Sequence, residues 1–476
     1  MEPTSVKNDE VGSTGSDDGL TWTEQEEKSL VRRVDLVIMP LLVFGFFVLQ
    51  LDRGNLGNAM TDNFLVDVGI NQFQFNVGNQ LMFVGIIVFE IPSNLVLYRV
   101  GPAAWIGCQI LAWGLVATFQ AFIKGHGHAA YYVTRFLLGA CECGYIPAGL
   151  YTITKFYKRD ETSKRFSLFF LGSMVANACG GIIAYGILRM RDVAGLTGWQ
   201  WLFLVEGMLT VVVAIAFVCF FPRSTERPIS ILGVRYFTEH ESRILTARVQ
   251  RDDPTKVHEH VHVKKEEFKA TFKNWRLISH VVTTICAFSS TSPLNAYGPS
   301  IIASYGYTKL TANAMSSIGY WILIFTTIGW GIAADMWGKR GPLVLLGVSI
   351  GCIMMIANRA IVNTDRLHGK FALITLIKAF GMAWHPVHGS WMALNTKSSG
   401  ERSITMAIFI MSANVAGLAS GQIFQAEDKP LYRTAWTTVL SLSCIGVAAA
   451  SWSNLQYWVL NRRAVKAGAE VKPYHA

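Results

Sequence analysis

Residues 165–180 read RFSLFFLGSMVANACG, and residues 402–417 read RSITMAIFIMSANVAG. Aligned at a shift of 237 residues, the two stretches share an arginine, a methionine, an alanine and a glycine, and they place Asn177 opposite Asn414. Polar residues that match at one shift are not expected from chance similarity between apolar sequences. The two stretches therefore mark an internal repeat, and each belongs to one of two halves.

The composition around the repeat indicates a membrane protein. Of the 476 residues, 51% are hydrophobic and only 16% are charged, whereas soluble globular proteins carry about 25% charged residues. Apolar runs of about 20 residues recur along the chain, which is the pattern of transmembrane helices. We therefore expect an all-α membrane protein.

Hydropathy in a window of about 19 residues predicts about 12 transmembrane helices. They are expected near residues 36–58, 73–97, 103–123, 129–151, 165–188, 199–221, 277–303, 312–334, 342–361, 370–394, 402–424 and 434–459. A second match between the halves, RVGP at 99–102 and KRGP at 339–342, has nearly the same shift. Six spans in each half give both halves the same orientation, so the sequence predicts two six-helix parallel repeats, an arrangement found in transporters.

The predicted domain organisation has five parts. They are a disordered cytoplasmic N-tail (1–35), an N-terminal half (36–221), a charged cytoplasmic central loop (222–276), a C-terminal half (277–460) and a cytoplasmic C-tail (461–476). Lysine and arginine are more numerous in the tails and in the connectors on their side than in the other connectors. By the positive-inside rule, both termini are expected in the cytoplasm. The net charge of +10 has the same explanation, so nucleic acid is not an expected partner.

The sequence does not favour an enzyme. The eight cysteines are scattered in or beside apolar runs, without CxxC or other metal-ligand spacing. A nucleophile elbow, an HExxH motif, a Walker loop and a haem ligand pair are all missing from the sequence. We therefore expect neither catalysis nor a cofactor or bound metal.

The stretch LQLDRGNLGNA at 49–59 places two charges, Asp52 and Arg53, at the end of an apolar run. A charge at the centre of a span costs about 2.5–3.5 kcal/mol on insertion scales, and such residues usually face a water-filled cavity. Successive residues are about 100° apart on a helix, so the two side chains cannot point the same way. Two interpretations stay open: both side chains reach the outer surface, or they face an internal cavity.

The fourth predicted span carries Arg135 and Glu142. The two residues are seven positions apart, which is about two turns, so they share one face of the helix. A lone carboxylate near the midplane takes up a proton or finds a partner. The sequence leaves open whether Glu142 forms a permanent ion pair or exchanges a proton. Glu90 and Glu206 are also intramembrane acids, and we expect structural roles for them.

Three other spans supply further polar groups. Lys378 and His385 are seven positions apart in the tenth span and share a face, and His388 follows one turn later. Asn177 and Asn414 occupy related places in the two halves. Each histidine or asparagine could instead be a core residue bonded to a neighbouring helix, and zinc is not expected because a third ligand is missing. The ammonium group of Lys378 is harder to place without an anion.

Several of these stretches resemble the major facilitator superfamily. GIAADMWGKR at 331–340 is similar to its loop signature G-x-x-x-D-x-x-G-[RK]-[RK], whereas the equivalent first-half stretch, SNLVLYRVGP, lacks the acidic residue. LDRGNLGNA, RFLLGACECGYIPAGLY at 135–151 and GWQWLFLVEG at 198–207 resemble more narrowly the anion:cation symporter family, and within it the fungal allantoate-permease branch. The stretch that begins at His385 most resembles the sulfur-compound carriers of that branch.

The expected site residues fall into three groups. The resemblance implies proton coupling by Asp52 and Glu142. Substrate binding is implied for Arg53 and Arg135 by the resemblance, and expected for Lys378, His385, Asn177 and Asn414 from their places in the spans. Inner-gate contacts are expected from Asp335, Lys339 and Arg340.

The function implied is proton-coupled import of a small organic anion by alternating access, the cargo being a carboxylate, a vitamin or a sulfur compound. An exporter of a secondary metabolite on the same fold and a nutrient sensor without transport are the alternatives. The expected partners are this anion, protons and the lipid bilayer, and the protein is expected to act as a monomer in the plasma membrane.

Overall fold

The computed structural model describes residues 20–226, 228–252, 265–396, 399–429, 431–467 and 474. Within these residues the regular structure is helical, and one isolated bridge pairs Ile229 with Arg235. The remaining parts of the expected tails and central loop lie outside the described residues.

The N-terminal half contains seven of the longer helices. They are α1 (Glu24–Ala59), α3 (Gln72–Val100), α4 (Pro102–Phe119), α5 (Gly127–Glu142), α6 (Tyr145–Phe156), α7 (Arg159–Ile187) and α8 (Gly198–Phe220). The connectors hold η1 (Met60–Asp62), α2 (Phe64–Val68), η2 (Gln120–Phe122), η3 (Leu188–Met190) and η4 (Val193–Gly195). Polar caps fix helix starts: Asn71 Oδ1 accepts from the backbone N–H of Gln74 at 2.8 Å where α3 begins.

The C-terminal half repeats this order. The central connector holds α9 (Glu239–Asp252) and α10 (Lys265–Phe272). The half itself holds α11 (Arg276–Thr291), α12 (Pro293–Ala303), α13 (Lys309–Ser316), α14 (Ile318–Trp337), α15 (Arg340–Ile361), α16 (Leu367–Phe380), α17 (His385–Leu394), α18 (Ser399–Ser420), η6 (Ala426–Asp428) and α19 (Arg433–Lys466).

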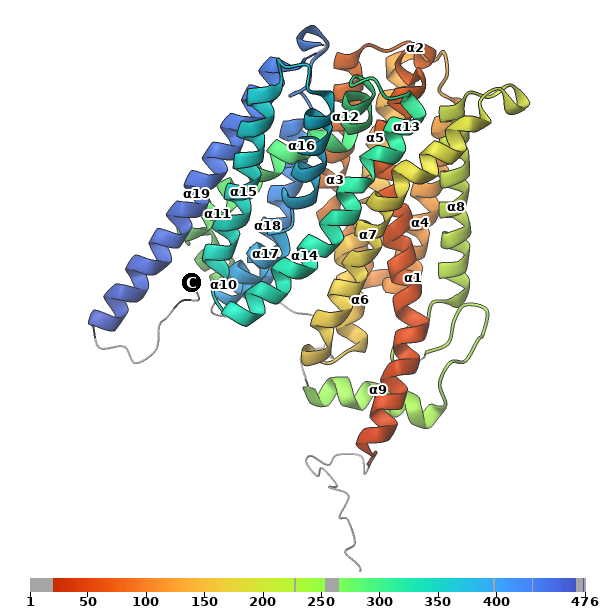
Figure 1. Ribbon diagram of the computed structural model, residues 1–476. Helices are drawn as coiled ribbons and strands as arrows, with labels where there is room; N and C mark the ends of the chain where they lie inside the picture. Colours follow the sequence, from red (N-terminus) through yellow and green to blue (C-terminus); the bar gives the residue numbers. More distant parts are fainter. Residues whose placement is uncertain are drawn as a thin grey trace, which may run out of the picture.

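The two halves share one packing plan (Figure 1). In the first half α1 packs on α7, α3 on α5 and α4 on α8. The equivalent pairs of the second half are α11 with α18, α14 with α16 and α15 with α19. The same pairs of spans are thus in contact in both halves, which confirms the repeat predicted from the sequence. Both ends of the described chain lie at one end of the bundle (Figure 1), which we call the terminal face; the opposite end is the far face.

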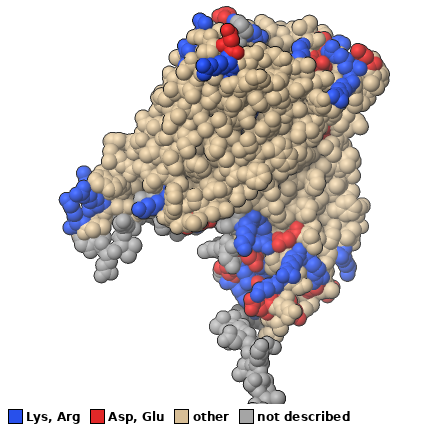
Figure 2. All heavy atoms as spheres, viewed as in Figure 1, with Lys and Arg blue, Asp and Glu red and all other residues tan. Residues whose placement is uncertain are grey.

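The surface has the character of a membrane protein. On the side shown in Figure 2, charged side chains gather at the two ends of the molecule, and a broad band between them is uncharged. Large apolar side chains are exposed on the molecule, such as Leu36 at 75% and Phe325 at 71%, and lipid would cover such a surface. Within the described residues, nine helical segments are long and apolar enough to cross a membrane. The other predicted spans, 73–97, 370–394 and 402–424, coincide with α3, with α16 and α17, and with α18.

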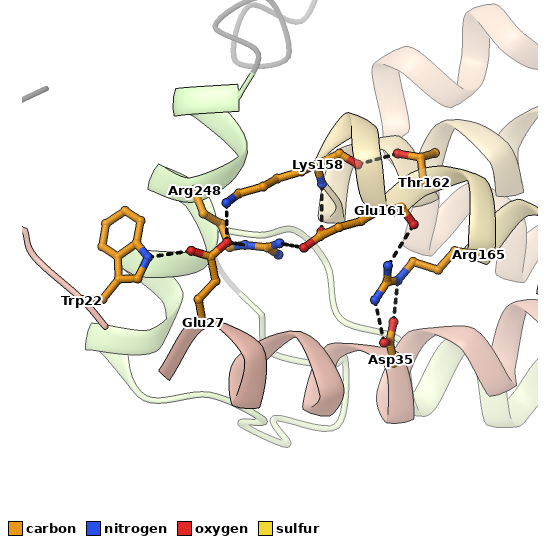
Figure 3. A network of polar contacts seen from close by, with 8 residues as sticks. All are labelled: Trp22, Glu27, Asp35, Lys158, Glu161, Thr162, Arg165 and Arg248. Carbon is orange, nitrogen blue, oxygen red and sulfur yellow. Dashed lines mark hydrogen bonds and ion pairs between the residues drawn. The ribbon is translucent and has the colours of Figure 1, made fainter. Parts of the chain in front are cut away.

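Helix α1 begins at Glu24, twelve residues before the predicted span and within the segment expected to be a disordered tail. Its first turns contact the connector helix α9. Arg248 of α9 is fully buried and forms ion pairs with Glu27 of α1 and Glu161 of α7 (Figure 3). Lys158 also pairs with Glu27. These ion pairs therefore order the start of α1 and hold α9 against the N-terminal half. A hydropathy profile does not predict them, because it scores only how apolar each residue is.

Candidate functional site

A cavity of about 240 Å³ lies between the two halves. Residues of α1, α3 and α7 form its wall on one side, and residues of α12, α13, α14 and α18 form it on the other. Its polar lining consists of Gln50, Arg53, Asn58, Asn79, Asn177, Ser292, Asn295, Tyr297, Ser316, Ser317, Tyr320, Asn414 and Ser420. Among the described residues that line it, Arg53 is the only charged one.

Four spans break close to this cavity. The break between α5 and α6 directly follows Glu142, and Pro147 next to it lacks the N–H of a regular helix. The other breaks fall at Ser292 between α11 and α12, at Ser317 between α13 and α14, and around Met382 between α16 and α17, and all three residues line the cavity. Interrupted helices within a membrane are tolerated where they line a cavity. The breaks and the cavity therefore indicate the same site.

Arg53 and Glu142 form an ion pair at the cavity wall. Arg53 Nε lies 2.5 Å from Glu142 Oε2, and the Glu142 side chain is 1% exposed. Arg53 lines the cavity and Glu142 does not, so the carboxylate lies behind the guanidinium. Removing one partner of a buried pair costs about 3–5 kcal/mol, because a charge is left buried alone. The sequence predicted both residues for the site, and the structure joins them directly.

Arg135 and Asp52 lie deeper in the N-terminal half. Arg135 is fully buried, with Nη2 3.0 Å from the sulfur of Met82. Asp52 Oδ2 accepts a hydrogen bond of 2.9 Å from Thr210 Oγ1 of α8. Neither residue lines the cavity, whereas Met82 does. The expected direct contact of Arg135 with substrate is therefore not available in this conformation, because Met82 stands between.

The four charged residues nevertheless form one cluster. The charges of Glu142, Arg53 and Asp52 all act on the Arg135 guanidinium, whose Nε and Nη1 have no hydrogen-bond partner among the described residues. Two acids and two cations thus lie close together at and behind the cavity wall. A change of charge at one member changes the electrostatic interactions of the others.

The two asparagines of the repeat both line the cavity, Asn177 from α7 and Asn414 from α18. Asn177 Nδ2 donates to the carbonyl of Ser173 at 3.0 Å, and its Oδ1 accepts from Gln50 Nε2 at 3.4 Å. An amide has two N–H donors and an oxygen with two lone pairs, so Asn177 has capacity left for a ligand. The repeat thus brings one amide from each half to the same space.

Lys378 is buried in α16, directly behind the cavity wall. Its Nζ lies 2.5 Å from Ser316 Oγ and 4.6 Å from the centre of the Tyr320 ring, and both of these residues line the cavity. Among the described residues, the ion pairs do not include Lys378. An ammonium inside a membrane protein is costly without a partner, so Lys378 is a candidate counter-charge for an anion.

His385 lies one ring away from the cavity. Its ring stacks on Phe409 with centroids 4.4 Å apart, and it lies equally close, at 4.4 Å, to Phe288. Phe288 lines the cavity and His385 does not. The expected contact of His385 with substrate is therefore blocked by an aromatic side chain in this conformation.

His388 belongs to a separate polar chain in the C-terminal half. Its Nε2 lies 2.8 Å from Nδ1 of His280, and Nε2 of His280 lies 3.1 Å from the Tyr457 hydroxyl. Tyr457 also lines a second cavity, of about 250 Å³, at the terminal face. Because residues of α10, α11, α17, α18 and α19 surround that cavity, it lies within one half and not between the two.

The three expected gate residues lie at the terminal face of the C-terminal half. Arg340 Nη2 is 3.6 Å from Asp335 Oδ1, and Arg340 Nε donates to Ser390 Oγ at 3.1 Å. Lys339 precedes the first residue of α15. These contacts join α14, α15 and α17 of one half, so a gate between the halves stays a prediction.

The halves are closed against each other at the far face. Gln72 and Asn76 of α3 donate to the carbonyl of Phe424 at 2.9 and 3.2 Å, and Gln80 donates to the carbonyl of Leu418 at 3.0 Å. Toward the terminal face the ribbons of the two halves diverge (Figure 1). Hydrogen bonds between the halves thus close the far side of the cavity.

Glycines permit this close approach. A Cβ atom added to Gly181 of α7 would lie 2.2 Å from the carbonyl oxygen of Asn313 in α13. A Cβ atom on Gly57 of α1 would lie 2.6 Å from the carbonyl oxygen of Asn295 in α12. Real Cβ atoms do not approach oxygen so closely, so the contacts between the halves depend on these two glycines.

The cavity residues that α12, α13 and α14 contribute were not predicted from the sequence. Asn295, Tyr297, Ser316 and Tyr320 line the cavity, but serine, asparagine and tyrosine are ordinary residues within spans. The sequence feature that marks this region is Pro293, which lies two positions before Asn295, at the break before α12.

Residues 42–421 match the protein family described as Major Facilitator Superfamily. The chain belongs to the major facilitator superfamily. An uncharacterized transporter of Saccharomyces cerevisiae is 29% identical over 460 residues, which cover 95% of this chain and 84% of that protein. The major facilitator-type transporter hxnP of Emericella nidulans is 25% identical over 457 residues, which cover 92% of this chain and 87% of that protein.

Solved structures show the same fold. A D-xylose-proton symporter has a TM-score of 0.65 at 14% identity, covering 88% of this chain and 97% of its own. A bacterial homologue of the human lysosomal transporter Spinster, in an inward-facing and unoccupied conformation, has a TM-score of 0.67 at 12% identity, with 91% and 97% covered. The predicted fold is confirmed, and the family confirms that this superfamily member is a membrane transporter and not an enzyme.

Proposed function

We propose that this transporter couples protons to the uptake of a small organic anion, such as a carboxylate, a vitamin or a sulfur compound. The observation that carries the proposal is the Arg53–Glu142 ion pair at the wall of the cavity. A guanidinium that faces a cavity suits a carboxylate or a similar anion. Here that guanidinium is already occupied by an acid that can take up a proton. Proton and anion therefore act on the same group.

The proposed cycle follows from this competition. While Glu142 is ionised, it occupies Arg53. A proton on Glu142 removes the competing charge, and Arg53 then binds the anion, with Asn177 and Asn414 bonding it from the two halves. With both the proton and the anion bound, the cavity carries less net charge than with the anion alone. Closing it therefore costs less desolvation free energy. After the halves rock, release of the proton restores the Arg53–Glu142 pair and displaces the anion.

The other charged residues have indirect roles in this proposal. Lys378 adds a second positive charge behind Ser316 and favours an anion over a neutral cargo. Asp52 is a second proton-coupling group. Arg135 lies near both Asp52 and Glu142, so a change of charge on Asp52 affects Glu142 through Arg135, which does not contact the cargo. Each ligand shifts the equilibrium between conformations only through its different affinity for them. The proton and the anion are therefore expected to bind the two conformations unequally.

We also propose the finer classification that the sequence motifs imply. The chain is placed in the anion:cation symporter family, in its fungal allantoate-permease branch, at the plasma membrane with both termini in the cytoplasm. The terminal face would then be the cytoplasmic side. A deletion strain separates import from export, because an importer's loss prevents growth on its cargo and an exporter's loss makes the cargo accumulate.

The test is transport by the purified protein in proteoliposomes. A growth screen of the deletion strain on sole nitrogen, sulfur and vitamin sources supplies the labelled anion. In Glu142→Gln we expect exchange of labelled for unlabelled anion to persist and net uptake driven by an inward proton gradient to be lost. Glu239→Gln, an exposed position in α9, is the control and should behave as wild type. Unchanged gradient-driven uptake in Glu142→Gln would remove this residue from the mechanism.

A further inference from the structure

Two acidic side chains lie together across the contact between α1 and α8, inside the N-terminal half. Asp52 of α1 and Glu206 of α8 are each only 2% exposed, and the charge of Asp52 acts on Glu206. Among the described residues, both carboxylate oxygens of Glu206 and Oδ1 of Asp52 are without a hydrogen-bond partner. The sequence favoured a structural role for Glu206, yet a structural carboxylate in a core is normally hydrogen-bonded.

The surroundings of the pair supply little compensation. Thr210, one turn after Glu206, donates its hydroxyl to Asp52 at 2.9 Å. Asn55, almost one turn after Asp52, lies beside Glu206. Helix α4 contributes the uncharged indole of Trp113 next to Asp52. The ion pairs among the described residues include neither of the two acids.

The buried charges of this half do not balance when every acid is ionised. The cations are Arg135 and Arg53, whose side chain is 18% exposed, and the fully buried acids are Asp52, Glu142 and Glu206. Glu90 of α3, also near Arg53, is only partly buried. An uncompensated buried charge costs several kcal/mol, and such a group becomes neutral by binding a proton. Two cations balance two carboxylates, so the third carboxyl group is expected to be protonated.

We propose that Asp52 and Glu206 form one proton-binding site, which holds a single proton between the two carboxyl groups while the far face is closed. Neighbouring carboxyl groups cannot both ionise without a strong repulsion, so the first proton is held firmly. This site is separate from Glu142, which is paired with Arg53. The proton is exchanged with water, and no other bond forms or breaks.

Arg135 connects this site to the cavity, and this step rests on the proposed proton coupling. The charges of Asp52 and Glu142 both act on Arg135. When the Asp52–Glu206 pair is protonated, Arg135 is drawn less to Asp52 and interacts more strongly with Glu142. Glu142 then competes less for Arg53, which becomes available to the anion. A proton bound far from the cavity thereby raises the affinity for the cargo.

The test detects the proton directly and needs no cargo. The full chain in lipid nanodiscs is studied by infrared spectroscopy at about pH 7, where exposed carboxyl groups are ionised. Protonated carboxyl groups have a separate C=O band that shifts in D2O. We expect this band in the wild type, its loss in Glu206→Gln and in Asp52→Asn, and its retention in the control Glu90→Gln. Size-exclusion profiles and thermal unfolding of the same samples show whether each variant is folded.

The outcomes separate this site from the proposed function. A band that persists in folded Glu206→Gln overturns the proposal, and so does a loss that Glu90→Gln shares. If the band is lost only in Glu206→Gln and Asp52→Asn, the site is supported, even where transport turns out not to depend on a proton gradient. If transport is proton-driven, Glu206→Gln should also show a lower ratio of protons to anions than the wild type.

Discussion

The glycine contact between α7 and α13 offers a sharp test of alternating access. Gly181 lies where the two halves touch, and a Cβ atom there would lie 2.2 Å from the carbonyl oxygen of Asn313 and 2.5 Å from Ser317 Oγ. Gly186 lies one and a half turns later on the same helix, with nothing within 4 Å of an added Cβ. Gly181→Ala and Gly186→Ala are therefore the same chemical change in two different environments.

The magnitude follows from overpacking. Adding a methyl group to a tight contact costs about 1–3 kcal/mol. The contact joins the two halves, so this cost applies to the conformation closed at the far face and disappears when the halves separate there. A difference of about 1–3 kcal/mol changes the ratio of the two conformations about 5- to 150-fold. Gly186→Ala should leave the ratio unchanged.

The assay measures access to the cavity from the far face. Asn58 lines the cavity and is only 7% exposed. Asn58→Cys, in a chain whose native cysteines have been replaced, is labelled by a membrane-impermeant maleimide added on the far-face side. We expect labelling to be about 5- to 150-fold faster with Gly181→Ala than with Gly186→Ala, while the open form remains the minor one. Equal labelling rates in the two variants would refute the reasoning that this contact closes the far face.

Three further predictions concern cargo binding and the connector. Lys378→Met should raise KM for the anion about 10-fold, because losing the positive charge behind Ser316 removes an attraction on the order of 1.4 kcal/mol; uptake kinetics at fixed pH check this. Arg248→Ala should destabilise the docking of α9 by about 3 kcal/mol, since two acids lose a buried partner; limited proteolysis of α9 measures it. Burial of Glu241 opposes its ionisation, but hydrogen bonds from Arg33 and Thr238 outweigh this and lower its pKa below the ordinary 4.5. Its contribution to docking is therefore full above that value and lost as pH falls through the lowered pKa, so cleavage of α9 should increase only in acid, and Glu241→Gln should remove this dependence.

Part of the site could be predicted from sequence because it depends on local spacing. Seven positions put Arg135 and Glu142 on one face of a helix, and the structure places both in one charged cluster. The repeat placed Asn177 and Asn414 at equivalent positions, and both line the cavity. Periodicity and internal symmetry therefore predict which helix faces are polar and which residues correspond.

The rest of the site depends on how each helix is rotated within the bundle. Asp52 meets Thr210 across 158 residues of sequence, and local spacing does not predict this pairing. The same holds for Met82, which separates Arg135 from the cavity, and for Phe288, which separates His385 from it. Such shielding depends on how side chains of neighbouring helices pack. The spacing of polar residues along one helix does not predict it.

The division of charge between the two halves has a consequence for how such transporters diversify. The buried acids and both arginines of the cluster belong to α1, α5 and α8, whereas the second half contributes an ammonium, an amide and aromatic rings around the same space. In the proposed mechanism, the acids that bind the proton therefore all belong to the first half, whereas both halves contribute groups around the cargo. Exchanging the second half between related transporters should therefore change the preferred cargo while proton coupling is retained. This is a short route by which one fold comes to serve many nutrients.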